Sequence, residues 1–228
     1  MSGAEQFSAG PPQGSRSAAK PKLDPLGGSA VLASSVATDD GEVASVGATS
    51  PLIELKRVSV VFGGAVRALD DVSLSISQGE IVGLVGESGS GKTTLCRVLV
   101  GLTAATAGTV ELGGKALSEL LAKEPLAFRR RVQMLLQDAV ASLSPRMTVG
   151  RALQEPIAIH DLPRQQAMDR LQTILKRLGL PADVLAKFPH QISGGQARRV
   201  GVARALVMQP QIIVADEPTA GLDVSVQG

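Results

Sequence analysis

Eight consecutive residues, from Gly86 to Thr93, could bind a polyphosphate. They read Gly86-Glu87-Ser88-Gly89-Ser90-Gly91-Lys92-Thr93 and match the pattern G-x-x-x-x-G-K-[ST] of phosphate-binding loops. Glycines let backbone N–H groups converge on phosphate oxygens, and the helix that follows adds the positive end of its dipole. Lys92 would place a cation between the β- and γ-phosphates, the Thr93 hydroxyl suits Mg²⁺, and Thr94 extends the nucleotide site. A chance match in a glycine-rich turn is the alternative, and the flanking strand and helix disfavour it.

Two adjacent carboxylates, Asp216 and Glu217, follow the apolar run from Ile212 to Ala215. A parallel α/β sheet opens its ligand crevice at the carboxyl ends of its strands. Asp216 would hold Mg²⁺ through water, and Glu217 would polarise the water that attacks the γ-phosphate in line. Alone, the pair could equally be a solvated strand end, but beside a phosphate loop the functional interpretation is favoured.

A second potential anion site is the run Ser193-Gly194-Gly195-Gln196. A serine hydroxyl and two glycine amides at the start of a helix are suited to bind a phosphate. The alternative is an ordinary loop with an N-cap serine. Two phosphate-binding surfaces in one chain are unusual for a monomer.

The elements that must position these residues are predicted from hydrophobic periodicity. Partial alternation over 52–62 and 72–76 predicts two antiparallel strands joined by a turn at Phe62-Gly63-Gly64. The apolar run 81–85 predicts a buried parallel strand. The following helix has an apolar face of Leu95, Val98, Leu99 and Leu102, with Cys96 beside it.

The second half of the chain continues an α/β order. A buried strand is expected at 132–136, and a helix at 168–178 that stops at Gly179 before Pro181. A further helix over 197–208 ends near Pro210, and 212–215 is expected to be a buried strand. The run Arg129 to Arg131 is interpreted as a solvated helix end rather than a nucleic-acid patch.

In this order the motifs resemble those of ABC transporter ATPases. Ile192-Ser193-Gly194-Gly195-Gln196 is similar to the family signature Leu-Ser-Gly-Gly-Gln, and it precedes the carboxylate strand as in the family. The resemblance implies an α/β P-loop cassette with a mostly parallel core sheet, an antiparallel β-subdomain and a helical signature subdomain. It also implies a head-to-tail homo- or heterodimer in which each signature faces the γ-phosphate of an ATP held by the other protomer.

Three further residues acquire roles only through this resemblance. Gln137 corresponds to the glutamine that touches Mg²⁺ and the attacking water and leads to the membrane-subunit contact. Phe62 matches the aromatic residue that stacks on adenine, although a core phenylalanine is nearly as plausible. Thr219 to Asp223 matches the family's D-loop, with Gly221 a mild departure, and Asp223 is expected to act across the dimer interface.

The resemblance covers residues 52–228 and suggests that the domain is incomplete at its C-terminus. In the family another strand and a switch histidine follow the D-loop. His160 and His190 both precede the carboxylate strand, so we interpret them as surface or helix-end histidines. A shortened cassette that binds ATP but hydrolyses it poorly is therefore an alternative.

The transported solute is suggested by the stretch QDAVASLSPRMTV, residues 137–149. It is similar to a run in importer ATPases for dipeptides, oligopeptides and nickel, with Ser144 where that run has asparagine. Peptide import is the preferred interpretation, and a nickel or other solute importer is the alternative.

Composition sets outer bounds on these interpretations. The 228 residues are 44% hydrophobic, and their formal charge of +2 does not indicate binding to nucleic acid. Cys96 is the single cysteine, so no disulfide within the chain is expected. Residues 1–50, rich in Ala, Gly, Ser and Pro, are expected to be a disordered tail before the nucleotide-binding domain at 51–228. Without an apolar run of ~20 residues, the chain is expected to be cytoplasmic and peripheral on the inner face of the membrane.

The leading hypothesis is thus a Mg²⁺-dependent ATPase that energises an ABC transporter. Its expected partners are a second ATPase subunit, transmembrane permease subunits and, indirectly, an extracytoplasmic solute-binding protein. A soluble cassette acting on nucleic acid or ribosomes is the competing class, and the sequence lacks the tandem cassettes or basic surface that would favour it.

Overall fold

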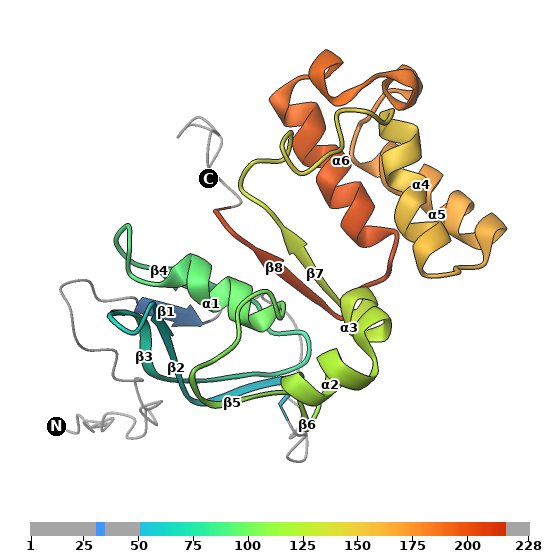
Figure 1. Ribbon diagram of the computed structural model, residues 1–228. Helices are drawn as coiled ribbons and strands as arrows, with labels where there is room; N and C mark the ends of the chain where they lie inside the picture. The colour runs from blue at the N-terminus through green and yellow to red at the C-terminus, as the bar shows by residue number, and fades with distance from the viewer. Residues whose placement is uncertain (1–30, 35–50, 218–228) are drawn as a thin grey trace, which may run out of the picture.

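The computed structural model describes residues 31–34 and 51–217, which form two lobes. Figure 1 shows one lobe that contains strands and helices, and a second lobe that is helical. The strands β7 (Val132–Leu135) and β8 (Ile212–Ala215) run between the lobes. Each lobe has its own cluster of buried apolar side chains, so each is packed as a separate core.

An antiparallel sheet of order β3-β2-β5-β6 forms the base of the first lobe. Its strands are β2 (Ile53–Phe62), β3 (Val66–Ile76), β5 (Ala107–Leu112) and β6 (Lys115–Ala116). Alternate residues of β2, including Ile53 and Leu55, are buried. The predicted hairpin with its turn after Phe62 is therefore confirmed.

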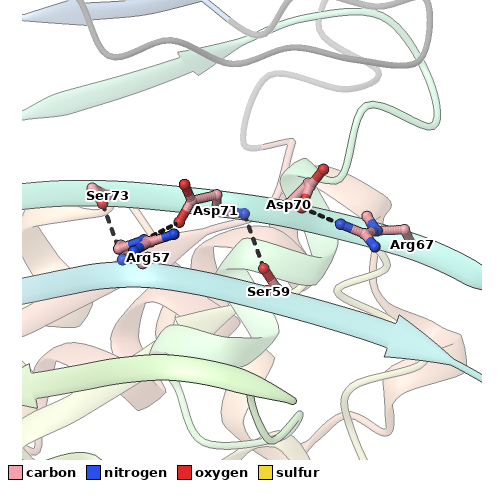
Figure 2. A network of polar contacts seen from close by, with 6 residues as sticks. All are labelled: Arg57, Ser59, Arg67, Asp70, Asp71 and Ser73. Carbon is pink, nitrogen blue, oxygen red and sulfur yellow. Dashed lines mark hydrogen bonds and ion pairs between the residues drawn. The ribbon is translucent and has the colours of Figure 1, made fainter.

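A register shift in the β2–β3 hairpin is held by a polar network (Figure 2). Arg57 and Asp71 both adopt left-handed backbone, with φ of 51° each, and their side chains pair at 2.9 Å between Nε and Oδ1. The Arg57 amide donates to Ser73 Oγ at 3.0 Å, and the Asp71 amide donates to Ser59 Oγ at 2.9 Å. These side chains replace ladder hydrogen bonds that the bulge interrupts.

The strand β4 (Val82–Val85) differs from its predicted form. It pairs antiparallel with β1 (Val31–Ser34), a strand in the stretch where none was predicted. Ile81, just before β4, is 79% exposed and Val85 is 59% exposed, so the predicted buried parallel strand is wrong in burial and in pairing. An apolar run shows that a strand can be buried, but its neighbours decide whether it is.

Three helices complete the first lobe. They are α1 (Lys92–Leu99), α2 (Leu117–Lys123) and α3 (Pro125–Arg131). Leu95, Cys96 and Val98 of α1 are buried against the sheet, as predicted, whereas Leu102 lies beyond the helix and is exposed. Arg129 to Arg131 form the last turn of α3, which confirms the expected helix end and matches the negative end of its dipole.

The parallel part of the described structure is the pair β7 and β8. Their register places Leu135 opposite Ala215, and the amide of Asp216 donates to the Leu135 carbonyl at 3.1 Å. Val132 and Val214 are buried, but Ile213 is exposed, so β8 is less buried than predicted. The two residues that follow β7 therefore lie level with the two residues that follow β8.

The second lobe consists of α4 (Val149–Ile159), α5 (Arg164–Arg177) and α6 (Gly194–Leu206), with the short 3-10 turns η1 (Ala182–Ala186) and η2 (Pro189–Gln191). Its core contains the buried side chains of Leu153 from α4, Leu171 from α5 and Val200 from α6. The predicted end of α5 at Gly179 is confirmed. The second lobe joins the two strands β7 and β8 as one long insertion.

Residues 1–30, 35–50 and 218–228 lie outside the described residues, so most of the predicted tail and the predicted D-loop fall there. His160 caps the C-terminus of α4, and His190 lies exposed in η2, as expected for helix-end and surface histidines. Over the described ranges, no helix combines the length and the apolar character that crossing a bilayer requires.

Candidate functional site

The predicted phosphate loop joins β4 to α1, as its motif requires. Gly91 has φ of 93°, and a Cβ on it would lie 2.5 Å from the Ala68 carbonyl oxygen. Only glycine therefore fits where the loop turns into the helix against β3. Leu95 continues the turn by donating its amide to the Gly91 carbonyl at 2.9 Å.

The ammonium of Lys92 is folded back over the loop. Its Nζ donates to the carbonyl oxygens of Gly86 and Glu87, each at 2.7 Å, and lies 3.4 Å from Ser90 Oγ. Among the described residues no carboxylate pairs with this cation. Neutral carbonyls can be exchanged for a bound anion, so the lysine is suited to a phosphate group.

The loop is joined to the carboxylate strand through one hydrogen bond. Thr93 Oγ1 donates to Asp216 Oδ1 at 3.1 Å, across 123 positions of sequence. Both groups are partly buried. Two hard oxygen donors at this separation fit a Mg²⁺ ion, which prefers oxygen ligands and keeps several waters.

Gln137 and Glu217 meet on the other side of Asp216. The parallel register brings the residues two positions beyond Leu135 and Ala215 to the same level, and Gln137 Nε2 donates to Glu217 Oε2. Both side chains are exposed, and Glu217 adopts left-handed backbone with φ of 48°. A non-glycine residue in that conformation is strained, and such strain tends to cluster at functional sites.

The aromatic ring of Phe62 is available at the end of β2. Its side chain is 45% exposed, whereas Phe128, in α3, is 2% exposed and belongs to the core. The alternative interpretation of Phe62 as a core residue is therefore wrong. An exposed ring beside a turn can stack on a flat heterocycle.

The signature run lies in the other lobe, at the start of α6 (Figure 1). Ser193 is the N-cap: its Oγ accepts the amide of Gln196 at 3.2 Å, and Gln196 Oε1 accepts the amide of Ser193 at 3.0 Å. A Cβ added to Gly194 or Gly195 would meet no atom within 4 Å. The N-cap interpretation is thus correct, and the glycine face of the helix start is open.

Two arginines of α6 belong to the site although the sequence analysis did not single them out. Arg199 bonds the signature turn to the end of α5, through Gly195, Leu178 and Gly179 carbonyls at 3.2, 3.2 and 3.3 Å. Arg204 bonds Glu155 of α4 at 2.9 Å. No local pattern signalled either residue, because their partners are backbone carbonyls and a glutamate 49 positions away.

A cavity of about 400 Å³ lies between the lobes. Its walls include the exposed apolar side chains Leu102, Leu136 and Ile159, together with Arg204. His160 also lines it, and burial together with the nearby Arg130 lowers the pKa of this imidazole. Leu136, which lines the cavity, directly precedes Gln137 in the chain, so the cavity adjoins the carboxylate site.

Cys96 lies in α1, one turn after the loop. Burial, and to a smaller extent the negative charge of Asp216, raise the pKa of its thiol to about 11. A thiol of this kind is a packing residue rather than a nucleophile.

The structure brings together most of the predicted residues in one lobe. The residues from Gly86 to Thr94 lie at the start of α1, Thr93 contacts Asp216, and Gln137 contacts Glu217. The signature from Ser193 to Gln196 stands apart in the helical lobe, and Asp223 lies outside the described residues.

Comparison with known proteins identifies the family that the sequence motifs resemble. The model of the ABC transporter family matches residues 69–220. The oligopeptide transport ATP-binding protein OppF of Streptococcus mutans is 44% identical over 183 residues, which are 77% of this chain and 59% of that protein. OppF of Salmonella typhimurium is 44% identical over 163 residues, or 71% of this chain and 49% of that protein. The chain thus spans about half the length of these relatives.

A solved structure agrees in fold. It is a dimeric ATP-binding cassette in a post-hydrolysis state with ADP and phosphate bound, with a TM-score of 0.64 and 30% identity over 76% of this chain and 77% of that one. The predicted α/β cassette with an antiparallel β-subdomain and a helical signature subdomain is therefore confirmed, whereas of its predicted mostly parallel core sheet the described residues show the parallel pair β7 and β8.

Proposed function

Because this chain belongs to the ABC transporter family, we propose that it binds and hydrolyses ATP to energise a membrane transporter that imports peptides. The observation that carries the proposal is the hydrogen bond from Thr93 to Asp216, which joins a phosphate loop to a carboxylate pair. The domain would comprise residues 51–228, after a tail of residues 1–50.

The loop would bind the triphosphate of ATP. The loop lies at the N-terminus of α1, whose dipole favours an anion. Lys92 would leave the Gly86 and Glu87 carbonyls and pair with the β- and γ-phosphates. Phe62 would stack on the adenine ring.

The carboxylate pair divides the remaining work. Thr93, Asp216 and the carbonyl oxygen of Gln137 would hold Mg²⁺, which neutralises charge on the phosphates when it is bound. Glu217 would orient the attacking water and accept its proton, and Gln137 fixes that carboxylate by donating to it. Glu217 adopts left-handed backbone directly after Asp216, and backbone strain of this kind is found at functional sites.

A second cassette would complete the site. The signature lies in a different lobe from the loop, so its open glycine face is available to a γ-phosphate held by another protomer. A dimeric solved cassette supports this arrangement. Asp223 would act across the same interface, and the partner would be a copy of this chain or a related subunit.

The cavity between the lobes would receive a permease subunit. Its apolar wall of Leu102, Leu136 and Ile159 suits an amphipathic helix, and Arg204 links this wall to α4 and to the Ser142 carbonyl, at 3.3 Å. Seated there, the chain would lie on the cytoplasmic face of the membrane. A solute-binding protein would reach it only through the permease.

Peptide is proposed as the solute because the relatives are named for oligopeptide transport. The ATPase supplies energy and does not itself touch the solute, so this part of the proposal rests on similarity alone. Peptide uptake by cells carrying the Lys92→Ala chain is expected to fail and would test it.

The direct test is ATP hydrolysis by the purified chain with Mg²⁺, over a range of protein concentrations. We expect turnover that rises more steeply than protein concentration, because two chains form each site. Lys92→Ala should abolish ATP binding, and Glu217→Gln should abolish hydrolysis while ATP still binds. Turnover that persists in Glu217→Gln would contradict the assignment of the general base.

A further inference from the structure

The first turn of α6 is intrinsically the least ordered part of the signature. Gly194 and Gly195 occupy its first two helical positions, and two glycines in a helix lose more backbone entropy on ordering than other residues. The capping box ties down Ser193 and Gln196, and the hydrogen-bond ladder of α6 begins at the Ser193 carbonyl. A contact anchored in another helix would order this turn further.

Arg199 makes the contact that does so. Its Nε donates to the carbonyl of Gly195 at 3.2 Å, and its Nη1 donates to the carbonyls of Leu178 and Gly179 at 3.2 and 3.3 Å. The Gly195 carbonyl thus bonds to a side chain that is itself anchored in another helix. The guanidinium has a planar fork of donors, which lets one side chain bridge both sites.

The charge of Arg199 explains why this bridge spans two helices. Arg199 lies beyond the first turn of α6, where the dipole of that helix has little effect on a charge. At the C-terminus of α5, where Leu178 is the C-cap, the same cation is favoured and satisfies carbonyls that have no partner within the helix. The end of α5 therefore holds the guanidinium beside the start of α6.

We propose that Arg199 is a positioning residue that fixes the peptide link between Gly195 and Gln196 and so orders the signature turn for a γ-phosphate bound by a second copy of this chain. This inference rests on the proposed function, because the phosphate arrives only with the partner. The partly buried cation also adds a favourable potential for that anion without needing to touch it.

A matched control exists at the opposite end of the same helix pair. Arg170 of α5 donates through Nη1 to the Val207 carbonyl, at 2.9 Å, beside the C-terminus of α6. It also joins α5 to α6 by an arginine-to-carbonyl contact, but it lies more than two helical turns from the signature. A role limited to stability would make the two arginines equivalent.

The test compares Arg199→Lys with Arg170→Lys, each in the Glu217→Gln chain, which should bind ATP without hydrolysing it. We expect Arg199→Lys to weaken ATP-dependent dimer formation about 10-fold or more, because lysine keeps the charge but cannot bridge the carbonyls. ATP binding to the monomer, measured at low protein concentration, should not change. Arg170→Lys should leave both quantities near those of the parent chain.

Three results are decisive. Equal dimer formation in the two variants overturns the positioning role, whether both are normal or both are weakened. Failure of the parent Glu217→Gln chain to dimerise with ATP overturns the proposed function and this inference with it. A third variant, Arg199→Gln, keeps a side-chain N–H but removes the positive charge. It should form the ATP-dependent dimer no better than Arg199→Lys, and better dimer formation would overturn the contribution of the charge.

Discussion

Lys92 contacts the loop that it would leave when a phosphate binds. Lys92→Ala removes the cation that would pair with the phosphates. We expect ATP affinity to fall about 100-fold or more, because two charge-assisted hydrogen bonds to phosphate oxygens are lost. Equilibrium binding of a fluorescent ATP analogue measures it. Lys123→Ala, which removes an exposed helix cation paired with Glu119, is the control and should bind ATP normally.

The thiol of Cys96 gives a prediction that needs no ligand. Burial raises its pKa from 9.0 to about 11, so at pH 8 roughly one thiol in a thousand is the reactive thiolate. We expect iodoacetamide to leave the native chain unmodified at pH 8 and to alkylate it once it is unfolded in urea. Mass spectrometry gives the readout, and rapid labelling of the native chain would contradict the buried position.

Residue types were predicted better than residue partners. The loop from Gly86 to Thr93 and the carboxylates after Ala215 carry their chemistry in a local pattern, which can be recognised in sequence. The bonds from Thr93 to Asp216 and from Gln137 to Glu217 join residues 123 and 80 positions apart. Arg199 could not be singled out, because its partners are backbone carbonyls, which any sequence provides.

At the scale of elements, glycines in the two anion sites serve different purposes. A Cβ on Gly91 would clash with the Ala68 carbonyl, while one on Gly195 would meet no atom. We expect Gly91→Ala to lower the melting temperature and abolish ATP binding. Gly195→Ala should raise helix stability slightly, by about 0.5–1 kcal/mol, yet slow hydrolysis, because its methyl group would stand in the path of the partner's phosphate.

Differential scanning calorimetry and steady-state hydrolysis separate these outcomes. A Gly195→Ala chain with normal turnover would show that the glycine face does not receive phosphate. A Gly91→Ala chain that melts like the parent would show that the loop tolerates a side chain where α1 begins.

The helices α1, α5 and α6 were predicted because their periodicity is local, as in α5, whose apolar face and end were both found, whereas α2 and α4 were not predicted. Among the strands, β2, β4, β7 and β8 were located, but β1, β5 and β6 were not. In the described structure β4 pairs with β1, and Ile81 and Val85 are exposed; neither could be predicted, because the residues of a strand do not specify its neighbours. Pairing between distant strands is a property of the whole chain.

At the scale of the whole molecule, the two cores predict two responses to mutation. Leu55 is buried in the first cluster and Leu153 in the second. Leu→Ala at either site should cost about 2–5 kcal/mol. Hydrogen exchange should rise first in α4 to α6 for Leu153→Ala and in the sheet lobe for Leu55→Ala.

The readout is exchange followed by mass spectrometry under native conditions. ATP binding that survives in Leu153→Ala but not in Leu55→Ala would agree with the loop belonging to the first core. Uniform exchange across both lobes in either variant would show that they unfold as one unit.

The parallel pairing of β7 with β8 makes the helical lobe exchangeable. Residues 136–211 leave at the carboxyl end of β7 and return at the amino end of β8, so the parallel register fixes the span between these two points at about one strand length. Gln137 and Glu217 are aligned by the register of the strands. A helical lobe of another length could therefore be transplanted between these two strands, which offers a route to chimeras that redirect an ATPase to a new permease while the catalytic carboxylates stay where they are.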